Sequence, residues 1–396
     1  MDYVFDYIYK DACGVSRDRA ISNLSIVTGG WTASARRLLF RDVRIRSWVH
    51  FNELVRMEGG RLLVVRTLHV DFGQCGSGGW QVDSDGDALF RLLQRTPNLV
   101  QLDLVGSRFP QFRPAHSRIM RSTVLLPHLI KLTIVNEEIP RPVIFDLLAT
   151  SQQRIKELAC IDMLQGQPPR SRPSDPLNFG GNLRKLSTQG TFNESLLDPS
   201  RVVLSSLVGL ESLSLEEEDF EEEPCRRMKK LFDVVGGSLR KLRIEGGADN
   251  IAQDLPSLTR LTELDLDYLA SSPAPVLRKL PPSITTLSLK SDDDIGPVLR
   301  FWILRPDLAP RKLQHISIRH ISDKQTWSFL PRINKFTIYY DPDVCSRLRE
   351  FTPSSVPFRI LELRFLRSCE VDEVWAAKFE CAKLGIELLP RTPDYS

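Results

Sequence analysis

Aliphatic residues recur along most of the chain with the spacing L-x-x-L-x-L, in which x is mostly polar. Clear copies begin at Leu99, Leu129, Leu210, Leu239, Leu261, Ile284 and Leu313, and weaker copies lie around Leu68, Leu158, Leu186, Phe336 and Leu363. About twelve segments follow one another at a mean interval of about 27 residues, which lies in the range of leucine-rich repeats. The pattern therefore predicts an array of similar units.

The spacing also predicts how the units fit together. In an extended segment alternate side chains face opposite sides, so the last two leucines of each copy point inward and the residue between them points outward. One segment cannot bury its aliphatic row, whereas stacked neighbours bury a continuous one. We therefore expect an α/β fold: a leucine-rich-repeat-type solenoid, with a curved parallel sheet and with helices and loops on its convex side.

Segments between the predicted strands carry helical patterns. Asp87 can cap a helix that ends before Pro97, and a second predicted helix ends at Gly236. Gly385 closes a third, in which the apolar residues are Val371, Val374, Trp375 and Phe379. The asparagine that leucine-rich repeats usually carry three positions after the last leucine is missing, because Ser107, Glu137, Glu218, Gly247 and Asp292 stand there. We therefore expect irregular turns after the strands.

Residues 1–45 do not follow the repeat. Three short apolar stripes at helical spacing predict helices there, and residues 40–45 are expected to leave the last helix as a short extended segment. We expect a helical module at 1–45, a linker helix at 46–60, a solenoid at 61–389 and a tail at 390–396.

The run Ile21-Ser-Asn-Leu-Ser-Ile-Val27, followed by Trp31 and by Ala35-Arg-Arg-Leu-Leu-Phe-Arg-Asp-Val43, resembles the second and third helices of the F-box in fungal F-box proteins. Trp48, Phe51 and Leu54, followed by residues 66–70, are similar to the linker helix and first repeat strand of the same proteins. The resemblance implies that the module docks on a Skp-family adaptor of a cullin-based (SCF-type) ubiquitin ligase and that the repeats bind a target protein. It assigns adaptor binding to Val4, Phe5, Ile8, Leu24, Val27, Trp31 and Leu39.

A second interpretation of the first 45 residues stays open. Solenoids need capping units that cover the apolar edge of the terminal repeat, and three short helices can act as such a cap. The chain would then be a repeat-based interaction scaffold with no link to ubiquitin transfer. The two roles of the helices are compatible with each other.

Charge and cysteine content narrow the class of partner. The chain has 53 basic and 50 acidic residues, a net charge of +3, so no overall field favours nucleic acid or a membrane. No run of about 18 apolar residues predicts a membrane span, and no secretory signal is recognisable at the N-terminus. The seven cysteines are dispersed without a C-x-x-C pair, which is typical of reduced thiols. We expect a cytoplasmic or nuclear protein, or one found in both compartments.

The outward residues of the predicted strands are the candidate target-binding surface. Their charges are mixed and aromatic residues are few, which favours a polar protein surface over stacked bases as the ligand. The candidates are Gln101, Asp103, Lys131, Glu157, Lys185, Lys241, Arg243, Glu263, Asp265 and His315. An ordinary solvated sheet face is the alternative. The acidic run 216–223 has two interpretations. The nearby basic run 226–230 can neutralise its charge, or the acidic run can form a rim that binds a basic target.

No arrangement of residues predicts catalysis or a cofactor. The acidic stretch 83–87 departs from a calcium loop because its glycine falls at the fourth position. The glycine-rich stretch 73–79 lacks the Lys-Ser/Thr pair that would contact phosphates. We expect a protein that is not an enzyme, without a metal or cofactor.

Overall fold

In the computed structural model the chain forms two compact units, Met1–Leu207 and Val208–Ser396, which are described separately. The described residues are 40–45, 51, 54–56, 62–71, 85–105, 126–135, 141–151, 153–161, 176–189, 198, 201–216, 222–246, 251–267, 274–290, 310–318, 333–339, 348–349, 352–353, 358–364 and 371–391.

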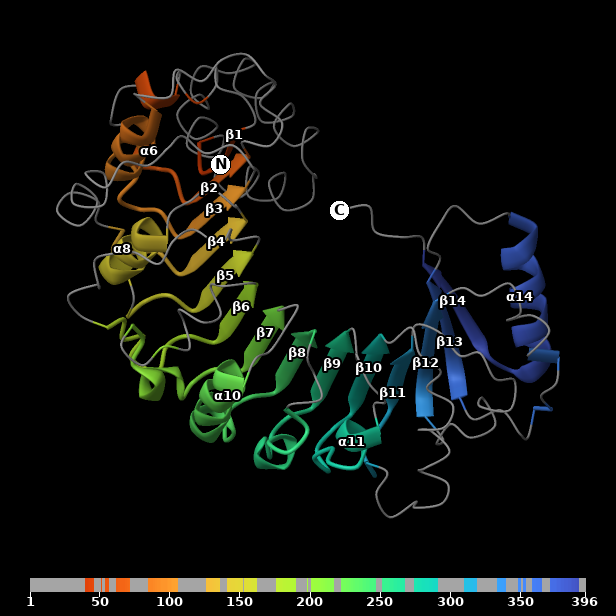
Figure 1. Cartoon of the computed structure of the whole chain (residues 1–396). Coiled ribbons are helices and arrows are strands. Elements are labelled where there is room, and N and C mark those ends of the chain that lie inside the picture. Colours follow the sequence, from red (N-terminus) through yellow and green to blue (C-terminus); the bar gives the residue numbers. More distant parts are fainter. Residues whose placement is uncertain are drawn as a thin grey trace, which may run out of the picture. The chain divides into compact units, whose positions relative to one another are not determined.

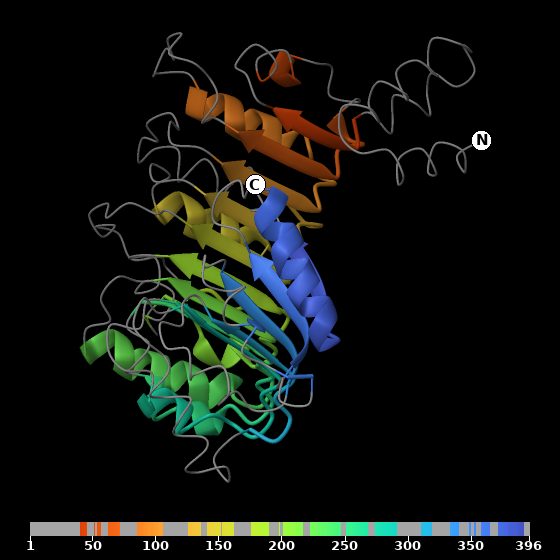
Figure 2. The same ribbon diagram turned by 90° about the vertical axis from the view of Figure 1, so that its right-hand side faces the viewer.

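The first unit contains six described strands, each parallel to the one before it. They are β1 (Asp42–Ile45), β2 (Thr67–Asp71), β3 (Gln101–Val105), β4 (Lys131–Val135), β5 (Glu157–Ile161) and β6 (Lys185–Gln189). Helices α6 (Asp85–Gln94) and α8 (Arg141–Ser151) lie on one side of these strands (Figure 1), and a 3-10 helix, η2, spans Leu204–Leu207. The turned view shows the strands stacked edge to edge (Figure 2).

The second unit continues the same construction with eight described strands, again parallel and in chain order. They are β7 (Ser212–Glu216), β8 (Lys241–Glu245), β9 (Glu263–Asp267), β10 (Thr286–Lys290), β11 (His315–Ile318), β12 (Ile333–Tyr339), β13 (Phe358–Arg364) and β14 (Glu387–Arg391). Its helices are α10 (Glu222–Val235), η4 (Leu255–Ser257), α11 (Ala274–Leu277) and α14 (Val371–Leu384). The described residues thus have the predicted α/β leucine-rich-repeat-type solenoid fold, with all neighbouring strands parallel.

The leucines of the repeat form the core, as predicted. In β2 to β5 buried and half-exposed residues alternate. Leu68, Leu102 and Leu132 stand in register on adjacent strands and are fully buried, and Leu242 and Leu264 occupy the same position in the second unit. The row is continuous within each unit because every strand places its central aliphatic residue beside that of the preceding strand.

The register at β13 corrects one expected position. The sequence pattern centres this repeat on Leu363, but Phe336 of β12 pairs with Leu361. Both residues are fully buried, and the ring of Phe358 lies 5.2 Å from that of Phe336. Strands β12 and β13 are seven residues long instead of the usual five, so the alternation extends further than the motif and offers two aliphatic positions as the centre.

The sheet extends beyond the repeats recognised in the sequence. Strand β1 pairs with β2 through Val43 and Leu68, so the short extended segment expected at residues 40–45 contains a strand of the sheet, although it was not expected as a repeat. At the other end β14 pairs with β13 and reaches Arg391, past the solenoid boundary expected at 389. Both strands lack the full L-x-x-L-x-L spacing, which explains why the motif did not identify them.

The turn before each strand is tied to the preceding repeat by a recurring pair of hydrogen bonds. The carbonyl oxygen of Arg66 accepts from the amides of Val100 and Gln101 at 2.7 and 3.0 Å. In the second unit, the carbonyl of Arg240 accepts from Thr262 and Glu263 at 2.8 and 2.9 Å. One carbonyl oxygen thus accepts two hydrogen bonds, so the two backbone amides at the start of the next strand both have partners where the strand pairing begins.

Side chains add a second link at these turns. The amide nitrogens of Asn98 and Asn182 donate to the carbonyls of Leu63 and Gln153, each at 2.8 Å. In the second unit the hydroxyls of Ser238 and Ser283 donate to carbonyls of the preceding repeat at 2.8 and 2.7 Å. The side-chain donors that the motif lacks after its strands are therefore present before them.

The helices between strands begin and end close to the predicted positions. Helix α6 starts at Asp85, two residues before the expected cap, and α10 buries Met228, Leu231 and Phe232 before it ends ahead of Gly236. A Cβ at Gly236 would stand 2.8 Å from the carbonyl oxygen of Ser257, so glycine is needed for the close approach.

Helix α14 has the predicted length but not the predicted buried face. Ala377, Cys381 and Leu384 are buried, whereas Trp375 and Phe379 are 61% and 63% exposed. The expectation that these two aromatic residues belong to the core stripe is wrong. Small and aliphatic residues at spacings of four and three occupy the face against the sheet and leave the larger rings outside.

The two cysteines whose side chains the structure describes are buried and form no disulfide. They are Cys160 in β5 and Cys381 in α14. Burial raises the pKa of Cys160 far above its usual value, because an apolar site disfavours the thiolate. Cys160 therefore acts as a small apolar core residue, as its strand position predicts.

Replacing Leu242 by alanine tests the row of buried leucines. Leu242 is 1% exposed, and we expect Leu242→Ala to lower the free energy of unfolding by about 2–5 kcal/mol through lost burial and a residual cavity. The neighbouring, outward Lys241→Ala should cost about 1 kcal/mol or less, since its ion pair is exposed. Urea unfolding followed by circular dichroism measures both, and equal losses would contradict the alternation.

Candidate protein-binding surface

The seven residues expected to bind an adaptor lie outside the described residues. They are Val4, Phe5, Ile8, Leu24, Val27, Trp31 and Leu39. Their assignment stays a prediction.

The ten residues expected to bind a target all lie on strands, and each is next to a buried aliphatic residue of its strand. Gln101, Lys131, Glu157 and Lys185 form one row in the first unit, because each stands in register with the next. Lys241, Glu263 and His315 belong to the equivalent row of the second unit, where Thr286 stands between the last two. Asp103, Arg243 and Asp265 occupy a second row, two residues further along their strands. We call the outward side chains of the strands the sheet face.

In the first unit polar contacts within a strand and between neighbouring strands hold side chains of the sheet face in place. The amide nitrogen of Gln101 donates to Asp103 at 2.7 Å, and His69 Nδ1 lies 3.7 Å from the same carboxylate. Lys185 Nζ is 2.7 Å from Glu157 Oε1. These contacts orient the side chains while leaving them accessible, so this part of the face has alternating charge and defined geometry.

In the second unit Arg243 lies among carboxylates. Its guanidinium is 2.9 Å from Glu245 and 3.9 Å from Asp265, and the adjacent Lys241 is 2.7 Å from Glu263. Partial burial disfavours the charged form of Arg243, but Asp265 and Glu245 outweigh it and raise the pKa of the guanidinium. Arg243 is thus a fixed positive charge in an acidic surrounding.

Sequence reasoning singled out Glu216 as part of the acidic run 216–223 but missed the two carboxylates that align with it. Glu216, Glu245 and Asp267 stand side by side on β7, β8 and β9, and Asp267 is buried. The signal for this row is the residue directly after the last leucine of each repeat. With Glu263 and Asp265, three strands carry five carboxylates against the two cations Lys241 and Arg243, a net charge of −3.

Strands β11 to β13 carry a more buried polar group. His315 Nε2 lies 2.8 Å from Thr337 Oγ1, within hydrogen-bond distance, and Lys335 forms an ion pair with Glu362. The sequence pattern placed Glu362 in the same row as Lys335, but the register pairs it with Thr337, and both Thr337 and Glu362 are fully buried. His315 is therefore oriented by its neighbour instead of standing alone.

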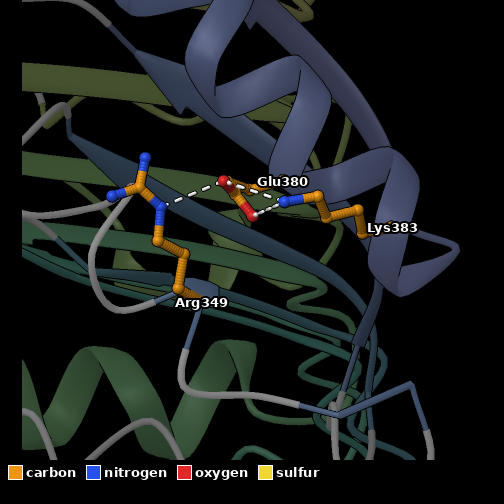
Figure 3. A network of polar contacts seen from close by, with 3 residues as sticks. All are labelled: Arg349, Glu380 and Lys383. Atoms are coloured by element: carbon orange, nitrogen blue, oxygen red, sulfur yellow. Dashed lines mark hydrogen bonds and ion pairs between the residues drawn. The ribbon is translucent and has the colours of Figure 1, made fainter.

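A separate polar network connects α14 to residues 348–349. Arg349 Nε donates to Glu380 at 3.0 Å, and Lys383 Nζ lies 3.2 Å from the other oxygen of the same carboxylate (Figure 3). Only 7% of the Glu380 side chain is exposed. The hydrogen bond from Arg349 lowers the pKa of Glu380 although burial opposes this, and Lys383 lowers it further.

Two negative findings concern the described residues alone. Nowhere in that part of the chain do three histidine, cysteine, aspartate or glutamate side chains gather in a way that would hold a metal ion. None of its helices combines the length and apolar character needed to cross a membrane.

Comparisons with known proteins give structural likeness at low similarity. No family model matches the chain, and no curated protein matches it in sequence. A yeast structure of Rad7 in complex with Elc1 shares 15% identity, with 98% of this chain and 92% of that chain covered and a TM-score of 0.46. A leucine-rich-repeat protein of Leptospira interrogans shares 13% identity, with 89% of each chain covered and a TM-score of 0.27. At these values the fold assignment rests on the strands themselves.

The Glu380 network predicts a pH-dependent contribution to stability. Because the folded-state pKa lies below the ordinary value of 4.5, the carboxylate stabilises the fold above that value, and the contribution is lost as the pH falls through the folded-state pKa. Glu380→Gln should therefore lower the urea midpoint at neutral pH, and the difference from the unmodified chain should shrink in acid.

The matched control is Glu387→Gln, which alters an exposed carboxylate on β14. It should leave the midpoint nearly unchanged at both pH values. A Glu380→Gln difference that is as large at about pH 3 as at neutral pH would contradict the ionic origin of the contribution.

Proposed function

We propose that this chain is the substrate-recognition subunit of a cullin-based (SCF-type) ubiquitin ligase. In this proposal residues 1–45 bind a Skp-family adaptor and the sheet face binds a target protein. The chain itself is not an enzyme and holds no cofactor, and it acts in the cytoplasm, the nucleus or both.

One observation carries the proposal. The stretch that resembles an F-box ends at Val43, and Val43 lies within β1, paired with Leu68 of the first recognised repeat. Hence no separate linking domain stands between the end of the adaptor-like motif and the sheet. A module whose last residues join the first strand can connect an adaptor to the sheet without an intervening domain.

The sheet face supports a protein target. Its charged residues are fixed by contacts at 2.7 to 2.9 Å, as for Lys185 with Glu157 and Arg243 with Glu245, and they are partly exposed. Pre-ordered charges favour a complementary polar surface, because less side-chain entropy is lost on binding. The net charge of −3 on β7 to β9 favours basic groups in the part of the target that lies there.

The mechanism requires no chemistry from this chain. Holding a target beside a ubiquitin-charged enzyme raises the effective concentration of its lysines, and this proximity supplies the rate enhancement. The chain's task is to bind two partners at once.

The alternative is a repeat scaffold without a link to ubiquitin transfer. It is favoured by the same sheet face, since a fixed, charged surface binds proteins whatever the N-terminal helices do. The two proposals differ only in the role of residues 1–45.

Adaptor capture distinguishes them. We expect the full chain to co-purify with a Skp-family adaptor when the two are co-expressed, and we expect Leu24→Asp or Trp31→Ala to abolish this capture by removing apolar contacts. The outward substitution Lys241→Ala serves as the control and should capture the adaptor normally. If the unmodified chain does not capture the adaptor, or if both variants capture it as well as the unmodified chain does, the result favours the repeat scaffold without a link to ubiquitin transfer.

Charge reversal on β9 tests the sheet face separately. Glu263→Lys combined with Asp265→Lys should remove the partners that photo-crosslinking recovers from cells through this face. The two new lysines repel the basic groups of a target that the carboxylates would attract. Adaptor capture should remain. The matched control reverses Lys229 and Lys230 to glutamate on the exposed side of α10. Loss of the same partners in the control and the β9 variant would contradict binding at the sheet face.

A further inference from the structure

Helix α14 presents two aromatic rings to solvent. Trp375 and Phe379 are 61% and 63% exposed and lie one helical turn apart, so they share a face. Among the helix side chains that the structure describes, large apolar residues are exposed on α14 alone. Helix α10, by contrast, exposes Lys229, Lys230 and Asp233.

These rings are not displaced members of the core. The inner face of α14 is occupied by Ala377, Cys381 and Leu384, all buried. Rotating the helix to bury the rings would bring the exposed Lys378 and Lys383 towards the sheet and expose the present core residues. An aromatic side chain buries a large apolar area when a partner covers it, so the outward rings are available for binding.

The same face is positively charged. Lys378 Nζ lies 4.9 Å from the centroid of the Trp375 ring, and Lys383 Nζ lies 4.3 Å from that of Phe379, so each ring is paired with an ammonium group. Arg349 adds a third cation, and Glu380 is the carboxylate that Arg349 and Lys383 share (Figure 3). Counted over the side chains that the structure describes around the rings, these four charged groups sum to +2. We call Trp375, Lys378, Phe379 and Lys383 the α14 face.

We propose that the α14 face binds an acidic protein segment that carries apolar anchor residues. The rings accept the anchors, and the ammonium groups of Lys378 and Lys383 pair with the segment's carboxylates. Charge complementarity decides the type of partner, because a basic segment would be repelled by the cations beside the rings. A membrane surface fits less well, since helices that lie in a bilayer present a longer apolar face than two rings one turn apart.

This site goes beyond the proposed function. It uses neither residues 1–45 nor the sheet face, so it would give the chain a third protein contact besides the adaptor and the target. Adaptor capture and target binding should be independent of the α14 face, and failure of one proposal is therefore distinguishable from failure of the other.

The test measures fluorescence anisotropy of a labelled acidic peptide titrated with the full chain. The peptide is rich in glutamate and places two leucines four positions apart, to match the spacing of the rings. We expect saturable binding that becomes at least about tenfold weaker in the double variant Trp375→Ala, Phe379→Ala. Val208→Ala, another exposed apolar residue, is the matched control and should bind normally.

A second variant separates the ionic part of the contact. Lys378→Glu should weaken binding and reduce its salt dependence, whereas Lys229→Glu on α10 should do neither. Because all these side chains are exposed, the urea midpoint should stay unchanged, and Trp375→Phe should retain most of the affinity.

Several results would overturn the proposal. One is equal affinity of the α14 variants and the unmodified chain for the peptide. Another is equal affinity of the unmodified chain for a peptide with serine in place of leucine. Binding through α14 to vesicles of phosphatidylserine and phosphatidylcholine, without peptide binding, would assign the face to a membrane. Self-association in sedimentation that disappears in the double variant would assign it to a second copy of the chain.

Discussion

The structure depends on the lateral pairing of each strand with the strand of the preceding repeat. A single repeat offers five strand residues with two or three inward side chains, too few to form a core by itself. Pairing in register places Leu102 beside Leu68 and Leu132 and makes the apolar row continuous. The same pairing aligns the outward residues, so one constraint forms both the core and the sheet face. A turn whose carbonyl accepts two amides from the next repeat fixes where each strand begins.

Much of this architecture was predictable from the sequence, because the repeat spacing and the alternation within a strand are local properties. Within the first unit the expected central residues from Leu68 to Leu186 stand in register, and within the second unit those from Leu213 to Phe336 do the same. The failure at Leu363 has a physical cause: in a seven-residue strand with leucines at 361 and 363, spacing alone cannot choose the partner of Phe336. Strands β1 and β14 were not recognised as repeats, because they join the sheet through backbone pairing and carry only part of the aliphatic pattern.

The candidate site was predictable as a surface but not as a set of contacts. Alternation identifies which residues face outward, and it did so for Lys185, Arg243 and Asp265. It cannot show that Arg243 contacts Glu245, or that Glu216, Glu245 and Asp267 line up, since these relations depend on the register between strands. In helix α14 the sequence pattern predicted the wrong face as buried. Counting apolar residues favoured Trp375 and Phe379 as core, whereas close packing selected Ala377 and Cys381 and left the rings for another partner.

In the proposed function the chain joins an adaptor, through residues 1–45, to a sheet of stacked repeats that binds a target. Hydrogen–deuterium exchange of the full chain, with and without a purified Skp-family adaptor, tests this most directly. We predict that adding the adaptor slows exchange within residues 1–45, while the amides of the repeat strands beyond β2 keep the protection that their pairing gives them. Unchanged exchange in residues 1–45, or new protection confined to the repeat strands, would contradict it.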